Sequence, residues 1–268
     1  MLVEVGGRRL KFDLLGADGG PVLCLCHSLS SDSGVWSAQV APLLGAGWRV
    51  LRLDMRGHGG SEAGAGGWTM AGLAGDVIGV LDALGLERVH FAGVSIGGMI
   101  GQQLGLDHPG RVQSLLLCGT SPQAVPGGQA MWDARFAAIR AAGSLAPLAA
   151  ATMARWFTGD FRARCPDRWQ QVHDTIAATA VAGYIAGAGA IIAFDVLDRL
   201  PEIRLPALVL CGDEDSGTPP AGNRLIAERI PGARYVEMPH ARHIPMLEYP
   251  ESFNRILFDW LGALSAGR

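Results

Sequence analysis

Residues 91–98 read Phe91-Ala92-Gly93-Val94-Ser95-Ile96-Gly97-Gly98. The apolar run that precedes Gly93 predicts a strand, and the segment Met99–Leu106 that follows predicts a helix. Glycine on both sides of Ser95 indicates a sharp strand-to-helix turn, where a Cβ would collide with neighbouring backbone. Such a turn exposes the serine hydroxyl, places the amide of Ile96 beside it, and aims the positive end of the helix at a developing oxyanion. The alternative is a glycine-rich turn with an ordinary surface serine.

The composition fits one domain, or one domain with an insertion. The chain has 268 residues, of which 49% are hydrophobic, so a large core is available. A net charge of −3 gives no electrostatic reason to expect nucleic acid or an anionic membrane as partner. No apolar run reaches the about 18 residues that span a bilayer, and no charged segment followed by an apolar one opens the chain. We therefore expect a cytoplasmic protein.

The cysteines are expected to be free thiols. The chain has five of them, an odd number: Cys24, Cys26, Cys118, Cys165 and Cys211. All but Cys165 lie in or beside apolar runs, where a free thiol behaves as a small hydrophobic residue. Cys24 and Cys26 would share one face of a strand, but no further ligands follow at a spacing that suits a metal. We expect no metal and no cofactor.

Strand-like and helix-like segments alternate along most of the chain. The predicted strands are Leu2–Val5, Leu10–Leu14, Val22–Cys26, Arg49–Leu53, Val89–Gly93, Val112–Cys118, Ala207–Cys211 and Ala233–Met238. The predicted helices between them are Met70–Leu84, Met99–His108, Gly222–Ile230 and Glu251–Leu264. From Val22 onward the strands lack twofold alternation, as in strands buried on both faces of a parallel sheet. The order predicts a doubly wound α/β fold of about eight strands, with the first two strands as an antiparallel hairpin at its edge.

Residues 121–200 break this alternation. They contain no clear strand and predict helices at Gln129–Ala141, Leu145–Phe157, Asp167–Ala180 and Gly183–Leu197. We expect a helical cap inserted into a core of residues 1–120 and 201–268. A cap at this point of the chain would cover the carboxyl edge of the sheet, where open α/β folds bind ligands.

A serine hydroxyl is a weak nucleophile without a base, and the base needs an orienting acid. The loop Cys211–Pro220 after a predicted strand offers Asp213 and Asp215, and we prefer Asp215 because it lies deeper in the loop. The segment after the last strand offers His240 and His243. We prefer His243, because His240 directly follows a proline and is expected to shape the loop.

The oxyanion requires a second donor besides the amide of Ile96. The loop 27–32 after an early strand has the right position, and we expect the backbone amide of Leu29 to serve. His27 is a candidate ligand or second base, but a histidine at such a turn more often holds the loop. Asp54, Arg56 and His58 are expected to brace the next loop, in which no Lys-Ser/Thr follows the glycines as a phosphate-binding loop requires.

Together these segments resemble the α/β-hydrolase superfamily over essentially the whole chain. The resemblance rests on His27-Ser-Leu, Asp54-Met-Arg-Gly-His-Gly-Gly-Ser, Gly93-Val-Ser-Ile-Gly-Gly, Gly212-Asp-Glu-Asp-Ser-Gly-Thr-Pro-Pro and His243-Ile-Pro-Met-Leu-Glu. It implies a catalytic triad of Ser95, Asp215 and His243, with the amides of Leu29 and Ile96 as the oxyanion hole. The serine–acid–histidine order is typical of this architecture and differs from the trypsin-like and subtilisin-like orders.

Within the superfamily the chain is most similar to 3-oxoadipate enol-lactonases, through Trp36, Arg155-Trp-Phe-Thr, Gly183-Tyr, Asp195 and Asp215-Ser-Gly-Thr-Pro-Pro. That resemblance implies hydrolysis of an enol-lactone with a free carboxylate, in aromatic catabolism through the β-ketoadipate route. Its pocket residues would include Ser28, Trp132, Arg155, Trp156 and Tyr184. We prefer Arg155 over Arg135 and Arg140 as the partner of the carboxylate.

Other functions remain open at this point. The same triad serves carboxylesterases, C–C (diketone) hydrolases and cofactor-free perhydrolases, which differ in pocket shape rather than in motif. A further alternative, from a different functional class, is a receptor that binds a ligand in the capped pocket without catalysing a reaction. The expected partner is a small lactone or ester, and the sequence leaves open whether the protein forms a homo-oligomer.

Overall fold

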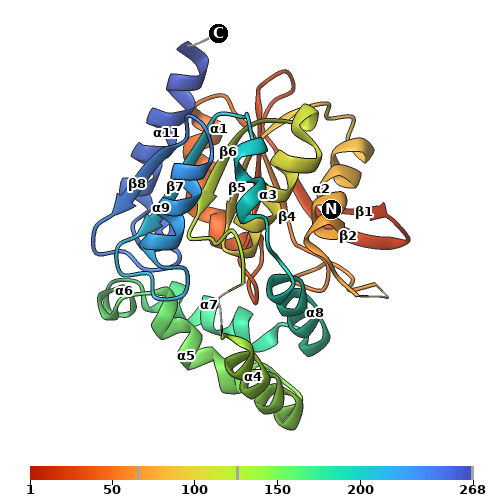
Figure 1. The fold of residues 1–268 in the computed structure, drawn as a ribbon, viewed down its shortest axis with the longest axis vertical. Helices are drawn as coiled ribbons and strands as arrows, with labels where there is room; N and C mark the ends of the chain where they lie inside the picture. Colours follow the sequence, from red (N-terminus) through yellow and green to blue (C-terminus); the bar gives the residue numbers. More distant parts are fainter. Residues whose placement is uncertain (65–66, 125–126, 267–268) are drawn as a thin grey trace.

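Eight strands form one mixed, mostly parallel sheet in the order β1-β2-β4-β3-β5-β6-β7-β8 (Figure 1). The structure is a computed structural model and describes residues 1–64, 67–124 and 127–266. The strands are β1 Leu2–Val5, β2 Arg8–Leu15, β3 Val22–Cys26, β4 Arg49–Leu53, β5 Val89–Val94, β6 Val112–Cys118, β7 Ala207–Gly212 and β8 Arg234–Met238. The predicted hairpin is confirmed, since β1 pairs antiparallel with β2 at one edge; β2 also pairs antiparallel with β4, and the remaining pairs are parallel.

The central strands are buried on both faces, and each face has its own core. Along β3, Cys24 and Cys26 belong to one hydrophobic cluster, whereas Leu23 and Leu25 belong to the other. Helices α2 (Met70–Ala83), α3 (Ile96–Asp107) and α9 (Pro220–Arg229) pack on the first face, and α1 (Ser37–Gly45) and α11 (Pro250–Ala266) on the second. This is the doubly wound arrangement that the continuous apolar runs predict.

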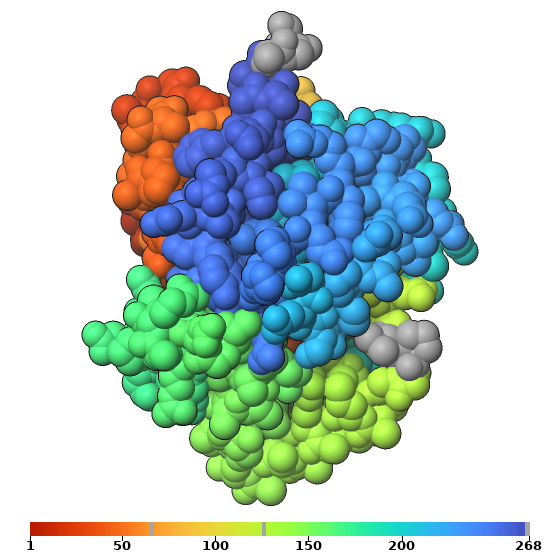
Figure 2. Space-filling model, turned by 90° about the vertical axis from the view of Figure 1, so that its left-hand side faces the viewer, coloured from red at the N-terminus to blue at the C-terminus, as the bar shows by residue number. Residues whose placement is uncertain are grey.

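The cap region follows β6 and precedes β7. It consists of α4 Gln129–Ala142, α5 Ala146–Trp156, α6 Gly159–Arg164, α7 Pro166–Ala178 and α8 Val181–Ile192. In Figure 1 these helices form a layer below one end of the sheet, and in Figure 2 the green cap lies directly against the blue C-terminal third. The chain enters and leaves the cap side by side, because Gln123 and Asp195 form an antiparallel bridge. Treating residues 121–200 as a separate domain remains our proposal; residues 125 and 126 lie outside the described ranges, as do 65, 66, 267 and 268 of the core.

Several predicted boundaries were wrong. Helix α3 begins at Ile96, directly after Ser95, and not at Met99. Helix α8 ends at Ile192 and not at Leu197, because the chain leaves the helix to form the bridge with Gln123. The sequence did not predict α1, α6, or the short helix α10 (Pro245–Glu248). The 3₁₀ helices η1 (Ser33–Trp36), η2 (Pro109–Arg111) and η3 (Leu197–Glu202) were also missed.

The five cysteines are free, and all but the half-buried Cys165 are buried. Among the described residues, no three His, Cys, Asp or Glu side chains gather as a metal site would require. No single described helix is long and apolar enough to cross a membrane; α7 and α8 pass that test only as a pair bent by 89°.

Candidate active site

Ser95 occupies the predicted turn between β5 and α3, in a backbone conformation that side chains rarely adopt. Its φ is 60° and its ψ is −119°. The turn is fixed on both sides, since the amide of Ser95 donates to Cys118 O at 2.9 Å and the hydroxyl of Thr120 donates to Ser95 O at 2.7 Å. A non-glycine residue at positive φ persists only where its surroundings enforce it, and such residues cluster at functional sites.

The two glycines flanking Ser95 leave no room for a side chain. A Cβ on Gly93 would lie 2.1 Å from Gly97 O, and one on Gly97 would lie 2.5 Å from Cys26 O. The predicted collision with neighbouring backbone is therefore confirmed at both positions.

Replacing Gly93 by alanine is accordingly expected to lower the free energy of unfolding by about 3 kcal/mol, the upper part of the range for overpacking. Urea unfolding followed by tryptophan fluorescence measures the loss. The control is Gly222→Ala in α9, where a Cβ meets nothing within 4 Å, so helix propensity should leave stability equal or higher. Equal stability of Gly93→Ala and wild type would contradict the tight turn.

Asp215 and His243 come from two different loops and form a hydrogen bond. Nδ1 of His243 donates to Oδ2 of Asp215 at 2.8 Å, and both side chains are buried. Asp215 also accepts the amides of Gly217 and Thr218 at 2.8 and 3.0 Å and the hydroxyl of Thr218 at 2.7 Å. Burial raises the pKa of this carboxyl, but His243 and these hydrogen bonds outweigh it and leave the pKa below its ordinary value. Asp215 is therefore ionised at neutral pH and can hold the imidazole in one tautomer.

The competing candidates lie elsewhere. Asp213 and His240 are exposed, and His240 has a φ of 59°, which suits its expected role in shaping the loop. Thr218 was not predicted as a site residue, although it lies only three positions after Asp215. Its hydroxyl also lies 3.2 Å from Nδ1 of His243, so it contacts both partners.

The loop that carries Leu29 is held rigidly by its neighbours. Nε2 of His27 accepts the amide of Met55 at 2.9 Å, and Nδ1 donates to Ser28 O at 2.8 Å. Burial lowers the pKa of His27, so the ring is neutral and has both nitrogens engaged, as expected for a structural histidine. Ser30 follows Leu29 at a φ of 60°. The amide of Ile96 lies in the first turn of α3, where N–H groups lack an acceptor within the helix.

The predicted brace of the next loop is also present. The buried carboxylate of Asp54 accepts the amides of Ser33 and Gly60, both at 2.9 Å. Arg56 forms a buried ion pair with Asp76 of α2. Burial lowers the pKa of His58 to about 3, so this ring too is neutral.

A cavity of about 290 Å³ between the sheet and the cap brings the predicted residues together. Ser95 and His243 line it with Leu29, and all five predicted pocket residues line it as well: Ser28, Trp132, Arg155, Trp156 and Tyr184. The ring centroids of Trp156 and His243 are 6.0 Å apart, and those of Trp132 and Tyr184 are 6.4 Å apart.

Arg135 also lines this cavity, which the sequence analysis did not favour. It lies three residues after Trp132 in α4, and that spacing alone puts both side chains on one helix face. Burial lowers the pKa of Arg155, and the nearby charge of Arg135 lowers it further. Within the described part of the chain, neither guanidinium has a carboxylate partner. The cavity is therefore lined by two guanidinium groups for which the described residues supply no counter-ion.

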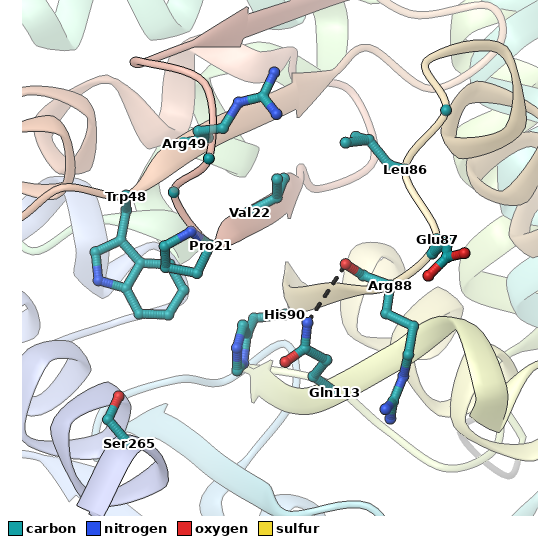
Figure 3. Close-up of a pocket in the computed structure, with 13 residues that line it drawn as sticks. Pro21, Val22, Trp48, Arg49, Leu86, Glu87, Arg88, His90, Gln113 and Ser265 are labelled. Carbon is teal, nitrogen blue, oxygen red and sulfur yellow. Dashed lines mark hydrogen bonds between the residues drawn. The ribbon is translucent and has the colours of Figure 1, made fainter.

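A second, larger groove of about 1030 Å³ lies at the amino ends of the strands, where β3 and β4 begin. Figure 3 shows Trp48, His90 and Gln113 around it, with Gln113 bonded to Arg88 O. Because Ser95 follows the carboxyl end of β5, this groove is remote from the serine.

The chain belongs to the α/β-hydrolase fold family, whose sequence profile matches residues 21–250. It is 31% identical to 3-oxoadipate enol-lactonase 1 of Acinetobacter baylyi, with 98% of this chain and 97% of the relative covered. It is 30% identical to a pimeloyl-[acyl-carrier protein] methyl ester esterase of Aeromonas hydrophila, over 91% of this chain and 96% of the relative. The enol-lactonase structure from Burkholderia xenovorans LB400 superimposes with a TM-score of 0.93 at 37% identity, covering 98% of this chain and all of that one (100%).

Proposed function

We propose that this protein is a serine hydrolase that cleaves a small lactone or carboxylic ester, most similar in activity to 3-oxoadipate enol-lactonase. The observation that carries the proposal is the convergence of Ser95 and the hydrogen-bonded pair His243–Asp215 on one cavity. The similarity to enol-lactonases over nearly the whole chain supports the substrate class. By the same similarity, the reaction would belong to aromatic catabolism through the β-ketoadipate route.

The proposed reaction begins when Nε2 of His243 removes the proton of Ser95 as Oγ attacks the carbonyl carbon. The amides of Leu29 and Ile96 donate to the oxyanion of the tetrahedral intermediate. The imidazolium then returns the proton to the leaving oxygen, which in a lactone stays attached to the acyl chain. Water activated by His243 releases the acid from Ser95. Throughout, the carboxylate of Asp215 stabilises the imidazolium and keeps its Nδ1–H pointed away from the serine.

The cavity favours a small substrate with a carboxylate. Its volume of about 290 Å³ lies at the lower end of the range for ligand pockets. Trp132, Trp156 and Tyr184 provide apolar walls. The guanidinium of Arg155 donates to Thr152 Oγ1 at 3.1 Å but has no carboxylate partner in the described part of the chain, so it is suited to a substrate carboxylate.

Replacing Arg155 by alanine is expected to raise KM for a carboxylated lactone about 10- to 100-fold, the value of a hydrogen bond to a charged group. KM for a neutral ester should change little, because that ester has no group to pair with the arginine. Steady-state kinetics on both substrates measure the difference. Arg140→Ala, at an exposed position of α4, is the matched control. Equal changes in KM for both substrates would remove Arg155 from carboxylate recognition.

Turnover across a panel of enol-lactones, saturated lactones, p-nitrophenyl esters and diketones tests the function as a whole. We expect the highest kcat/KM for an enol-lactone that carries a carboxylate. Turnover confined to diketones, or none with any substrate, would contradict the proposal.

A further inference from the structure

Glu248, at the end of α10, has a carboxylate that joins two segments far apart in the sequence. Its Oε1 accepts the amide and the hydroxyl of Thr158, at 2.6 and 2.5 Å. Its Oε2 accepts the amide of Arg242 at 3.0 Å. Thr158 lies between α5 and α6 of the cap, and Arg242 directly precedes His243. One side chain thus fixes both the cap and the loop of the histidine.

The burial of this carboxylate is costly without a positive partner. Glu248 is 1% exposed, and in the described ranges no cation lies within ion-pair distance of its carboxylate. Three hydrogen bonds from Thr158 and Arg242 replace its hydration. If one of these donors is removed, a carboxylate oxygen of Glu248 is left buried with a hydrogen bond missing, which is strongly unfavourable. The geometry around Glu248 is therefore tightly fixed.

Further contacts join the same two segments around His243. The guanidinium of Arg242 donates to Ala154 O at 2.6 Å and to Phe157 O at 3.1 Å, at the carboxyl end of α5. A cation at this end of a helix also interacts favourably with the helix dipole. On the other side of the histidine, the amide of Ile244 donates to Trp156 O at 3.4 Å. The residues before and after His243 are thus both bonded to the end of α5, the helix that carries Arg155 and Trp156.

We propose that Glu248 is a positioning residue that holds the His243 loop against the cap and thereby sets the imidazole between Asp215 and Ser95. The catalytic part of this inference rests on the proposed function. Glu248 touches neither the substrate nor the reacting atoms and acts through the backbone of Arg242. Since a misplacement of about 1 Å can cost on the order of 100-fold in rate, a small shift of this loop would reduce kcat.

The test compares Glu248→Gln with Glu251→Gln, the same change at an exposed position three residues further on. A glutamine keeps one acceptor oxygen but must turn its NH₂ group toward either Arg242 N–H or the donors of Thr158. We expect Glu248→Gln to lower kcat about 10- to 100-fold with KM within about threefold. Thr158→Val, which removes one O–H donor and leaves Glu248 in place, should lower kcat less, in the same direction. Glu251→Gln should leave both parameters unchanged.

A second readout needs no turnover: the ¹H resonance of the His243 Nδ1–H in the full-length protein. We expect it to move or broaden in Glu248→Gln and in Thr158→Val, but not in Glu251→Gln. A folded Glu248→Gln variant with wild-type kcat and an unchanged resonance would overturn the inference. Should Glu248→Gln fail to fold, Thr158→Val decides by the same criteria. A wild-type protein that hydrolyses no ester or lactone would overturn the proposed function, while the resonance would still decide the role of Glu248.

Discussion

Replacing Ser95 by alanine is expected to lower kcat about 10⁴- to 10⁶-fold, as removal of the nucleophile does in other triad enzymes. Without its hydroxyl no acyl-enzyme forms, and only binding and the oxyanion donors remain to accelerate attack by water. Steady-state turnover of the best substrate in the panel measures the loss. The change removes only the side-chain oxygen and keeps the backbone hydrogen bonds of residue 95 to Cys118 and Thr120, so urea unfolding should show little loss of stability.

Ser95→Ala should keep a residual activity above the rate of the uncatalysed reaction. The oxyanion donors and binding alone still give about 10³- to 10⁴-fold acceleration over water in triad enzymes. KM for Ser95→Ala should therefore stay close to that of the wild type. A folded variant that retained a tenth or more of wild-type kcat, as an order of magnitude, would place the nucleophile elsewhere.

The second large effect is expected at Asp215, where asparagine should lower kcat on the order of 10⁴-fold. In the wild-type protein the Nδ1–H of His243 donates to Oδ2 of Asp215 at 2.8 Å. An asparagine held by the amides of Gly217 and Thr218 would turn its NH₂ toward the ring, which favours the wrong tautomer for accepting the serine proton. Steady-state kinetics of Asp215→Asn measure the loss.

Asp213→Asn is the matched control, because it makes the same chemical change two residues away on an exposed side chain. We expect its kcat to stay within about twofold of wild type, as is usual for surface substitutions. If Asp213→Asn lost activity and Asp215→Asn kept it, the assignment of the orienting acid would be reversed.

The centre of the sheet was predictable because strands such as β3, β5 and β7 are buried on both faces. β3, β4 and β6 begin and end at the predicted residues, since apolar residues predominate in each and loop residues bound them. The sequence gives a weaker signal for α1, a nine-residue helix that contains Pro42 and ends at Gly45. For α8 the predicted helix was too long. Apolar residues continue beyond Ile192, but the backbone leaves the helix there and turns toward Gln123. That bridge is a tertiary contact and leaves no local pattern.

The residues of the site were predictable where a loop directly follows a strand. Ser95 and Asp215 each come after an apolar run that ends in a tight turn, so their place at the carboxyl edge follows from the fold. Arg135 was considered but ranked below Arg155, and Glu248 was given no role. The helical spacing of Arg135 to Trp132 would have favoured it for the cavity, whereas Thr158, the partner of Glu248, is 90 residues away in the sequence. Only the packing of the cap on the histidine loop brings that pair together.

We propose that Ser95, activated by His243 and Asp215, is the nucleophile of this hydrolase. The most direct test is to react the full-length protein with a fluorophosphonate and locate the adduct by mass spectrometry of its peptides. We predict a single adduct on Ser95 that is absent from Ser95→Ala and forms more slowly in Asp215→Asn than in Asp213→Asn. An adduct on another residue, or labelling that persists in Ser95→Ala, would contradict the account.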